Sequence, residues 1–297
     1  MEKELDTKFV HLKNAEIYAY REAGTSPKVL LILHGAASSS QIFTLFLPPL
    51  SETLRVIAVD LRGHGQSSYN SPLASHDDFV EDIKQFIEVL SIKKFYILGW
   101  SMGGNIAMKL AAQVPEKIEG LILLNSAGAK GFVVNKVDEN GNVTNERAQT
   151  KEEVYKNPGP MKLVNSIANQ DRETVRVGLK KSFFNGKAVL SSERLEVYVD
   201  EWLKCRCADC LPYNSNRYNI SNEHSGAAEG TNEISKIKCK TLILHGENDM
   251  GVLKKEAEYI KDCLGDLAKI KIFDNAGHIV IEDYPKEVLK LIQEFCS

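Results

Sequence analysis

The chain has 297 residues, of which 43% are hydrophobic and 26% are charged, so it is long enough for one large α/β domain or two small ones. A net charge of -3 and an isoelectric point near 6.2 give no electrostatic reason to expect nucleic acid or an anionic membrane as a partner. No apolar run approaches the roughly 20 residues that span a bilayer, and the charged start "MEKELDTKFV" lacks the apolar core of a signal peptide. We therefore expect a cytoplasmic protein with reduced thiols.

Short apolar runs rich in β-branched residues recur along the chain and predict eight strands. The first two are expected to form an antiparallel pair joined by a turn. Most of the others are almost continuously apolar, which is typical of strands that helices cover on both faces. The predicted strands lie within residues 8–14, 16–24, 28–35, 54–63, 94–101, 119–128, 240–249 and 268–278.

Helical patterns separate these strands, and the alternation of the two decides the fold class. It favours a mostly parallel, eight-stranded, doubly wound sheet with helices on both faces, that is, an α/β fold. The predicted helices are 76–91, 103–113, 253–264 and 285–296.

The alternation stops between residues 129 and 236 and resumes at Lys240. Within this segment "DENGNVTNE" and "NPGP" indicate turns, and two amphipathic stretches predict helices, at 173–184 and 192–205. Because the strand pattern returns afterwards, we interpret 129–236 as a helical cap inserted above the sheet. The core domain would then consist of residues 1–128 and 237–297.

The most specific motif is "GWSMGG", in which Gly99, Ser101 and Gly103 fit the pattern G-x-S-x-G. A strand that turns at once into a helix forces the residue between them into a strained backbone conformation, so its neighbours must lack side chains. The hydroxyl then stands at the carboxyl edge of the sheet, beside the N-terminal amides of the following helix. A glycine-rich turn with an incidental serine is the alternative.

A serine hydroxyl becomes a good nucleophile only when a base accepts its proton and a third group orients that base. The end of the predicted strand "LILHGENDM" offers Asp249, and the end of "KIFDNAGHIV" offers His278. The order serine, aspartate, histidine is the one expected of enzymes with a nucleophile elbow. Asp249 could instead cap the helix that starts near Leu253, and His278 could be an ordinary loop histidine, but all three at strand ends favour a triad.

Acyl transfer also needs N–H donors for the oxyanion. One is the amide of Met102, which follows the serine. The loop "HGAASSS" after the strand at 28–35 should supply the other, and Ala36 is the candidate. His34 lies at the foot of this loop, where we expect a structural role.

With these motifs the chain resembles the α/β-hydrolase superfamily, specifically its esterase–lipase-like members with a cap. The resemblance rests on "HGAASS", "DLRGHGQS", "GWSMGG", "HGENDMGV" and "NAGHIVIEDYP". It implies that Ser101 is the nucleophile, His278 the general base and then acid, and Asp249 its orienting group. In such proteins the segment 60–67 is usually structural, so Arg62 and His64 are not expected to be catalytic.

The cap should shape the substrate pocket, for which we expect contributions from Trp100, Phe183 and Trp202. The cap also holds aromatic residues that either line this cavity or form the cap's own core, namely Phe184, Tyr198, Tyr213 and Tyr218. Its basic residues could receive a substrate carboxylate, although a solvated helix face is favoured. These are Arg172, Arg176, Lys180, Lys181, Arg194, Arg206 and Arg217.

The family resemblance does not explain the sequence "CRCADC", which places Cys205, Cys207 and Cys210 close together. With His224 or Asp209 these cysteines could form a zinc or iron–sulfur ligand set. The spacing lacks a second CxxC pair, so a local disulfide or buried thiols are the favoured interpretation. We expect neither metal nor cofactor.

The predicted function is that of a serine hydrolase acting on a small-molecule substrate with an acyl group, namely an ester, thioester or lactone. A carbon–carbon bond hydrolase for vinylogous diketones would use the same residues. A small-molecule receptor that retains the fold and the triad is also compatible with the sequence.

Overall fold

A computed structural model describes residues 5–297 and contains an eight-stranded sheet in the order β1-β2-β4-β3-β5-β6-β9-β10. Strand β2 is antiparallel to both of its neighbours, and the remaining pairs are parallel. The predicted fold class and the predicted antiparallel pair are confirmed. The strands are β1 Thr7–His11, β2 Ile17–Ala23, β3 Val29–Leu33, β4 Arg55–Val59, β5 Phe95–Trp100, β6 Ile118–Leu124, β9 Lys240–Gly246 and β10 Ala268–Phe273.

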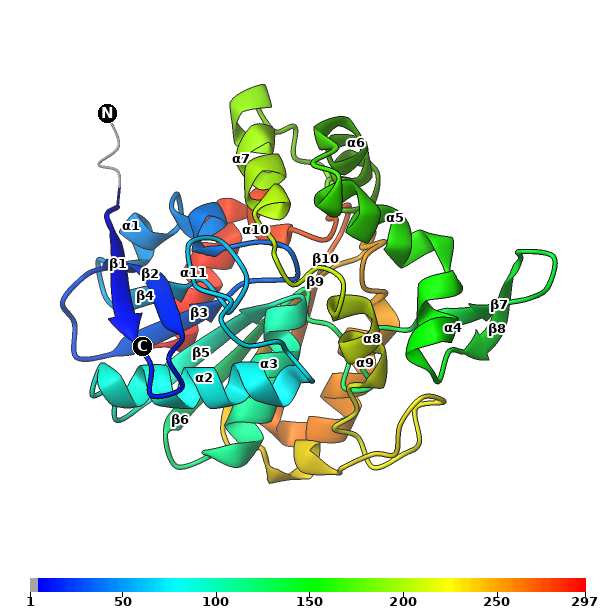
Figure 1. Cartoon of the computed structure of the whole chain (residues 1–297). Helices are drawn as coiled ribbons and strands as arrows, with labels where there is room; N and C mark the ends of the chain where they lie inside the picture. The colour runs from blue at the N-terminus through cyan, green and yellow to red at the C-terminus, as the bar shows by residue number, and fades with distance from the viewer. Residues whose placement is uncertain (1–4) are drawn as a thin grey trace.

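Helices lie on both sides of the sheet (Figure 1). Helix α3 packs against β3, β5 and β6 and contacts α2, whereas α1 packs against β2 and β4 and contacts α11. Helix α9 packs on the last two strands of the sheet. The bounds are α1 Leu47–Leu50, α2 His76–Val89, α3 Met102–Gln113, α9 Lys254–Leu264, α10 Val280–Asp283 and α11 Pro285–Phe295.

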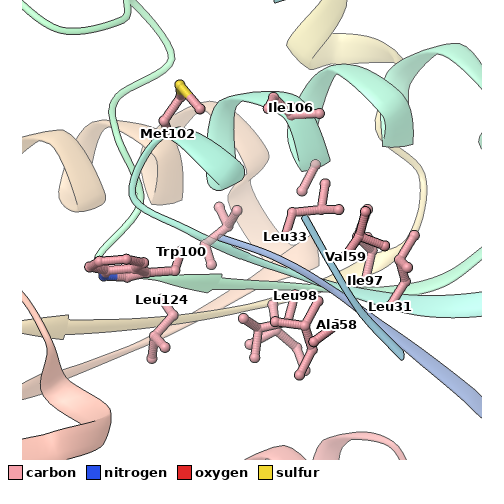
Figure 2. Packing of buried hydrophobic residues seen from close by; sticks show 14 of the residues in the cluster. Leu31, Leu33, Ala58, Val59, Ile97, Leu98, Trp100, Met102, Ile106 and Leu124 are labelled. Atoms are coloured by element: carbon pink, nitrogen blue, oxygen red, sulfur yellow. The ribbon is translucent and has the colours of Figure 1, made fainter. Parts of the chain in front are cut away.

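The central strands β3, β4 and β5 carry the core. All five residues of β3 are buried, as expected for a strand in the middle of a doubly wound sheet. Figure 2 shows Leu31 and Leu33 of β3 close to Val59 and Ile97 on the neighbouring strands, with Ile106 of α3 above them. This packing fixes the carboxyl ends of the strands, where Trp100 and Met102 flank the predicted nucleophile.

The segment between β6 and β9 folds into a short hairpin and five helices, at the top and right of the view in Figure 1. Two of the helices, α6 and α7, match the predicted amphipathic stretches. The elements are β7 Asn135–Val137, β8 Val143–Arg147, α4 Lys151–Lys156, α5 Pro158–Ala168, α6 Arg172–Ser182, α7 Ser192–Leu203 and α8 Leu211–Arg217.

Two details of this segment correct the sequence analysis. The motif "NPGP" is not a turn: the Asn157 side chain accepts a hydrogen bond from the amide of Gly159, and Pro158 occupies the first position of α5. An asparagine cap followed by proline is typical of the start of a helix. The first N–H groups of a helix have no partner within it, so the missing N–H of proline costs nothing there. Of the predicted turn "DENGNVTNE", only residues 138–142 form a turn, whereas residues 143–146 belong to β8, which pairs with β7 in a hairpin that the polar sequence did not predict.

Among residues 5–297, no helix is both long enough and apolar enough to cross a membrane. The charged start of the chain includes residues 1–4, which lie outside the described residues.

Candidate active site

Ser101 lies alone between β5 and α3, with φ 53° and ψ -121°. This conformation is rare for a residue with a side chain and is characteristic of strained functional positions. Two hydrogen bonds to the neighbouring β6 region hold it: the Ser101 amide donates to Leu124 O at 3.2 Å, and the Ala127 amide donates to Ser101 O at 3.0 Å. The predicted elbow is therefore present as a strand–serine–helix junction.

Close packing explains the glycines of the elbow. A Cβ atom at Gly103 would collide with the backbone carbonyl oxygens of Leu33 and His34, and one at Gly99 would collide with Gly103 itself. The absence of side chains at these positions lets α3 start directly against β3.

The structure brings the three predicted triad residues together. His278 Nε2 lies 3.0 Å from Ser101 Oγ, while His278 Nδ1 lies 2.8 Å from Oδ2 and 2.9 Å from Oδ1 of Asp249. The carboxylate accepts the Nδ1 proton, so Nε2 is free to accept the proton of the serine hydroxyl. Residues that are 148 and 29 positions apart in the sequence thus form one continuous hydrogen-bonded chain.

Asp249 is buried and held by several donors. Its Oδ1 accepts hydrogen bonds from the amides of Gly251 at 2.8 Å and Val252 at 2.7 Å. Burial alone would raise the pKa of the Asp249 carboxyl, but His278, His245 and the Val252 amide together lower this pKa. The carboxylate therefore stays ionised. The alternative role as a helix cap does not apply, since no side chain caps α9, which Leu253 precedes.

Asn125 is a site residue that the sequence analysis missed. It follows β6 with φ 43°, and its Nδ2 donates to Asp249 Oδ2 at 2.9 Å and to Gly277 O at 3.1 Å. Its Oδ1 accepts a hydrogen bond from the amide of Val280 at 3.1 Å. One buried side chain thus joins the acid to the loop that carries His278. In the sequence "LLNSAG", the only indication of a role for Asn125 is its position at the end of a predicted strand.

The loop after β3 lies against the serine. An added Cβ at Gly35 would come within 3.0 Å of both Ser101 Cβ and the Trp100 ring, and Ala36 follows directly. Met102 is the first residue of α3, so its N–H has no hydrogen-bond acceptor within the helix. His34 is structural in this arrangement, because its Nδ1 donates to Gly35 O and its Nε2 accepts from the Leu61 amide.

Of the predicted pocket residues, Phe183 has its ring nearer to the His278 ring than Trp100 does, although Trp100 directly precedes Ser101. The Phe183 ring meets the His278 ring edge to face at 4.6 Å between centroids and the Trp202 ring at 5.0 Å. Trp100 is buried on another side of His278 and donates its indole N–H to His278 O at 3.1 Å. The structure places aromatic rings around the histidine, but the role of Trp100, Phe183 and Trp202 in a substrate pocket stays a prediction.

Two surface hollows of about 540 and 450 Å³ lie elsewhere, beside the ends of β3 and β4 opposite to the triad. Their linings include Pro27 and Arg55, and neither includes Ser101.

The remaining aromatic residues of the predicted cap have partners of their own. Phe184 packs edge to face on Tyr198, whose hydroxyl donates to Glu282 at 2.7 Å. The Tyr218 hydroxyl donates to Asn105 O at 2.8 Å, and Tyr213 packs in a separate small apolar cluster. These contacts favour the interpretation of these four rings as packing residues.

Most of the basic residues in the cap are also paired. Arg172 and Arg176 form ion pairs with Glu196, and Arg194 pairs with Glu282. The guanidinium groups of Arg206 and Arg217 donate to backbone carbonyls. The expected solvated face is found for Arg172, Arg206 and Arg217, which are exposed, whereas Arg176 and Arg194 are half-buried in their ion pairs.

The segment 60–67 is buried, as the resemblance implied. The guanidinium of Arg62 donates to both oxygens of Asp82, at 2.7 Å and 2.5 Å. His64 packs against His34 with their ring centroids 5.0 Å apart. Neither Arg62 nor His64 contacts Ser101 by a hydrogen bond in the described part of the chain.

The cysteines of "CRCADC" are free thiols, of which Cys205 and Cys207 are buried and Cys210 is half-buried, so the structure agrees with the buried-thiol interpretation and not with the disulfide. His224, the predicted additional ligand, instead accepts a hydrogen bond from the Gly226 amide. His64, 141 residues before Cys205, lies beside Cys205 and Cys207 in its place.

The sheet order and the strand–serine–helix junction are those of the α/β-hydrolase fold, and the chain resembles the α/β-hydrolase superfamily. The model of a family described as the alpha/beta hydrolase fold matches residues 28–159. The structure resembles that of an esterase from Exiguobacterium antarcticum with a TM-score of 0.76 and 18% identity, over 98% of this chain and 99% of that one.

Two relatives illustrate how the sequence is shared. The chain is 23% identical to monoacylglycerol lipase ABHD6 of Rattus norvegicus over 99% of its own length and 82% of that protein. It is 38% identical to a serine hydrolase-like protein of Danio rerio, but over only 33% of this chain and 31% of that protein.

The packing of the elbow predicts opposite effects for two glycine substitutions. Gly103→Ala should lower the free energy of unfolding by about 1–3 kcal/mol or more, because the new methyl group meets rigid backbone. Gly178→Ala, inside α6 and with no atom within 4 Å of the added methyl, should raise it by about 0.5–1 kcal/mol. Urea denaturation of both variants measures the difference. Equal effects at the two positions would show that close packing does not constrain the elbow.

Proposed function

We propose that the protein is a serine hydrolase that cleaves a small carboxylic ester, thioester or lactone through an acyl-enzyme (EC 3.1.1). The observation that carries the proposal is the pair of hydrogen bonds linking Ser101 Oγ to His278 Nε2 and His278 Nδ1 to Asp249. An ester substrate is supported by the names of the similar proteins, a monoacylglycerol lipase and an esterase.

In the first half of the reaction, Ser101 Oγ attacks the substrate carbonyl carbon while its proton passes to His278 Nε2. The 3.0 Å separation is within the range expected of a nucleophile and its general base. The imidazolium that forms lies beside the ionised Asp249, whose negative charge stabilises it. His278 then protonates the leaving group, and the acyl group stays on Ser101.

The amides of Ala36 and Met102 are the proposed donors to the oxyanion. Met102 opens α3, so the partial positive charge of the helix N-terminus adds to its N–H. Ala36 is next to Gly35, which lies against Ser101. Each such donor contributes about 3–4 kcal/mol to transition-state stabilisation.

In the second half, water replaces the leaving group. His278 accepts a proton from this water as its oxygen attacks the acyl carbon, and the same proton returns to Ser101 Oγ when the acid is released. The proposed steps use only Ser101, His278, Asp249, the two amides and water.

Residues 129–236 are the proposed cap, on a core of residues 1–128 and 237–297. The cap reaches the triad at Phe183, whose carbonyl accepts a hydrogen bond from the His278 amide at 3.2 Å. The ring of Phe183 also covers the imidazole. Phe183 and Trp202 would then limit the space for the acyl or leaving group and exclude water from the imidazole.

The direct test is hydrolysis of p-nitrophenyl esters from acetate to dodecanoate. Wild-type protein should turn over at least one ester, and Ser101→Ala should lose at least about 1,000-fold in kcat, because no other described hydroxyl is hydrogen-bonded to His278. The acyl chain length that gives the highest activity would indicate the size of the acyl-binding site.

Ser166→Ala is a matched control, since this buried hydroxyl donates only to Lys162 O in α5. It should keep wild-type activity. Failure of the folded wild-type protein to hydrolyse any ester of the series would contradict the ester assignment and favour binding without turnover or diketone cleavage.

Asn125 should act as a positioning residue. Asn125→Ala removes a donor to Asp249 and an acceptor for the Val280 amide, so the acid and the histidine loop can shift relative to Ser101. Because a displacement of about 1 Å costs about 100-fold, we expect kcat to fall by about 10–100-fold with little change in KM.

Asn219→Ala is the matched control, because this buried asparagine side chain has four hydrogen bonds, all of them to residues 221–228 and none to the triad. It should lower stability without a comparable loss of kcat. Equal losses of kcat in both variants would indicate a general effect on folding.

A further inference from the structure

A second cluster of chemically reactive side chains lies outside the triad. His64, in the turn after β4, and Cys205 and Cys207, in the segment after α7, are all buried, and one donor atom from each lies within 4.8 Å of the other two. The proposed hydrolytic chemistry uses none of the three. They come from the core and from the proposed cap, so the cluster lies where those two parts of the chain meet.

The distances in the cluster are those of ligands around a metal ion. Cys205 Sγ and Cys207 Sγ are 3.8 Å apart, and Cys207 Sγ is 3.7 Å from Nδ1 and 3.9 Å from Nε2 of His64. A tetrahedral ion with bonds of about 2.3 Å to sulfur and about 2.0–2.1 Å to nitrogen separates two sulfurs by about 3.8 Å and a sulfur and a nitrogen by about 3.6 Å. The two sulfurs already have the separation that one shared ion requires, and the His64 ring has to turn so that its Nε2 points toward that ion.

The orientation of His64 also suits a metal ligand. Its Nδ1 lies 3.0 Å from Arg62 O, so the ring donates its Nδ1 proton to this carbonyl and leaves the Nε2 lone pair free. Histidines that bind metals commonly donate their other N–H to a carbonyl or carboxylate in this way.

The backbone holds the two cysteines against the turn. The Arg206 amide, between them, donates to Gly63 O at 2.8 Å, and the Arg206 guanidinium donates to Gly65 O. A Cβ at Gly63 would come within 2.9 Å of Cys207 Sγ, so the glycine makes room for this sulfur. The ligand set is preorganised by contacts that do not involve a metal.

We propose that His64, Cys205 and Cys207 bind one thiophilic metal ion, Zn²⁺ or Cu⁺, which fastens the cap to the core. Thiolate and imidazole ligands favour these ions over Mg²⁺ or Ca²⁺. Thiols that bind release their protons to solvent, and the ion neutralises the thiolate charge. The sequence suggested His224 or Asp209 as the ligand to accompany the cysteines, and the structure assigns this place to His64.

The test uses the full-length protein, purified under reducing conditions and stripped of metal by chelators. It is titrated with Co²⁺ as a spectroscopic substitute for Zn²⁺, and separately with Cu⁺ without oxygen. One ion per chain should bind, with thiolate-to-metal charge-transfer absorption, and competition between Zn²⁺ and Cu⁺ identifies the preferred ion. X-ray absorption of the loaded wild-type protein should show two sulfur ligands and at least one nitrogen ligand.

Variants then locate the site. Substitutions outside the ligand shell typically weaken metal binding by about 10–100-fold. Cys205→Ser and Cys207→Ser should each weaken metal binding by more than this. Cys263→Ser is the matched control, because this cysteine is exposed and distant from the cluster, and it should bind like wild type. Circular dichroism verifies that each variant is folded, and the absorption spectrum of the wild-type protein tests the ligands without any substitution.

A second measurement tests whether the metal ion fastens the proposed cap to the core. Metal should slow proteolysis within residues 129–236 of the wild-type protein and have no such effect on Cys207→Ser. The proposal is overturned if the reduced protein binds no ion, if Cys263→Ser abolishes binding, or if Cys205 and Cys207 form a disulfide under the same reducing conditions. None of these measurements depends on ester hydrolysis.

Discussion

The strained backbone of Ser101 is the constraint on which the site depends. A φ of 53° is unfavourable for serine and persists only because the surrounding structure leaves no alternative. Three features fix this backbone conformation: the end of β5, the start of α3 and the hydrogen bonds to the β6 region. The cost in conformational energy is of order 1–3 kcal/mol, which a core of this size can supply. In return the hydroxyl projects beyond the sheet edge rather than into the helix.

The same arrangement explains why the triad comes from strands far apart in the sequence. Parallel strands end at one edge of the sheet, so the loops after β5, β9 and β10 meet there. Asn125, after β6, fills the space between the loops after β9 and β10 with a side chain that bonds to both. The geometry of the proposed catalytic site is therefore a property of the whole sheet edge and not of one motif.

Much of the fold could be predicted from the sequence because its signals are local. Continuous apolar runs indicated the buried strands, and the glycines around Ser101 indicated the elbow. Asp249 and His278 were predictable because each follows a strand with a recognisable pattern.

The features that were missed depend on contacts between distant residues. Asn125 meets Asp249 across 124 residues, and His64 meets Cys207 across 143, so no local spacing indicates either pair. The "NPGP" sequence was misinterpreted because asparagine and proline favour turns and helix starts alike. Only the packing of α5 decides between the two.

The measurement that tests the central claim most directly is covalent labelling of the full-length protein with a fluorophosphonate, followed by peptide mass spectrometry. Its phosphorus reacts with a serine hydroxyl that a neighbouring base activates. We expect one adduct per chain, on Ser101, which forms far more slowly in His278→Ala. An adduct on another residue, no adduct on the folded protein, or the same labelling rate in His278→Ala would contradict it.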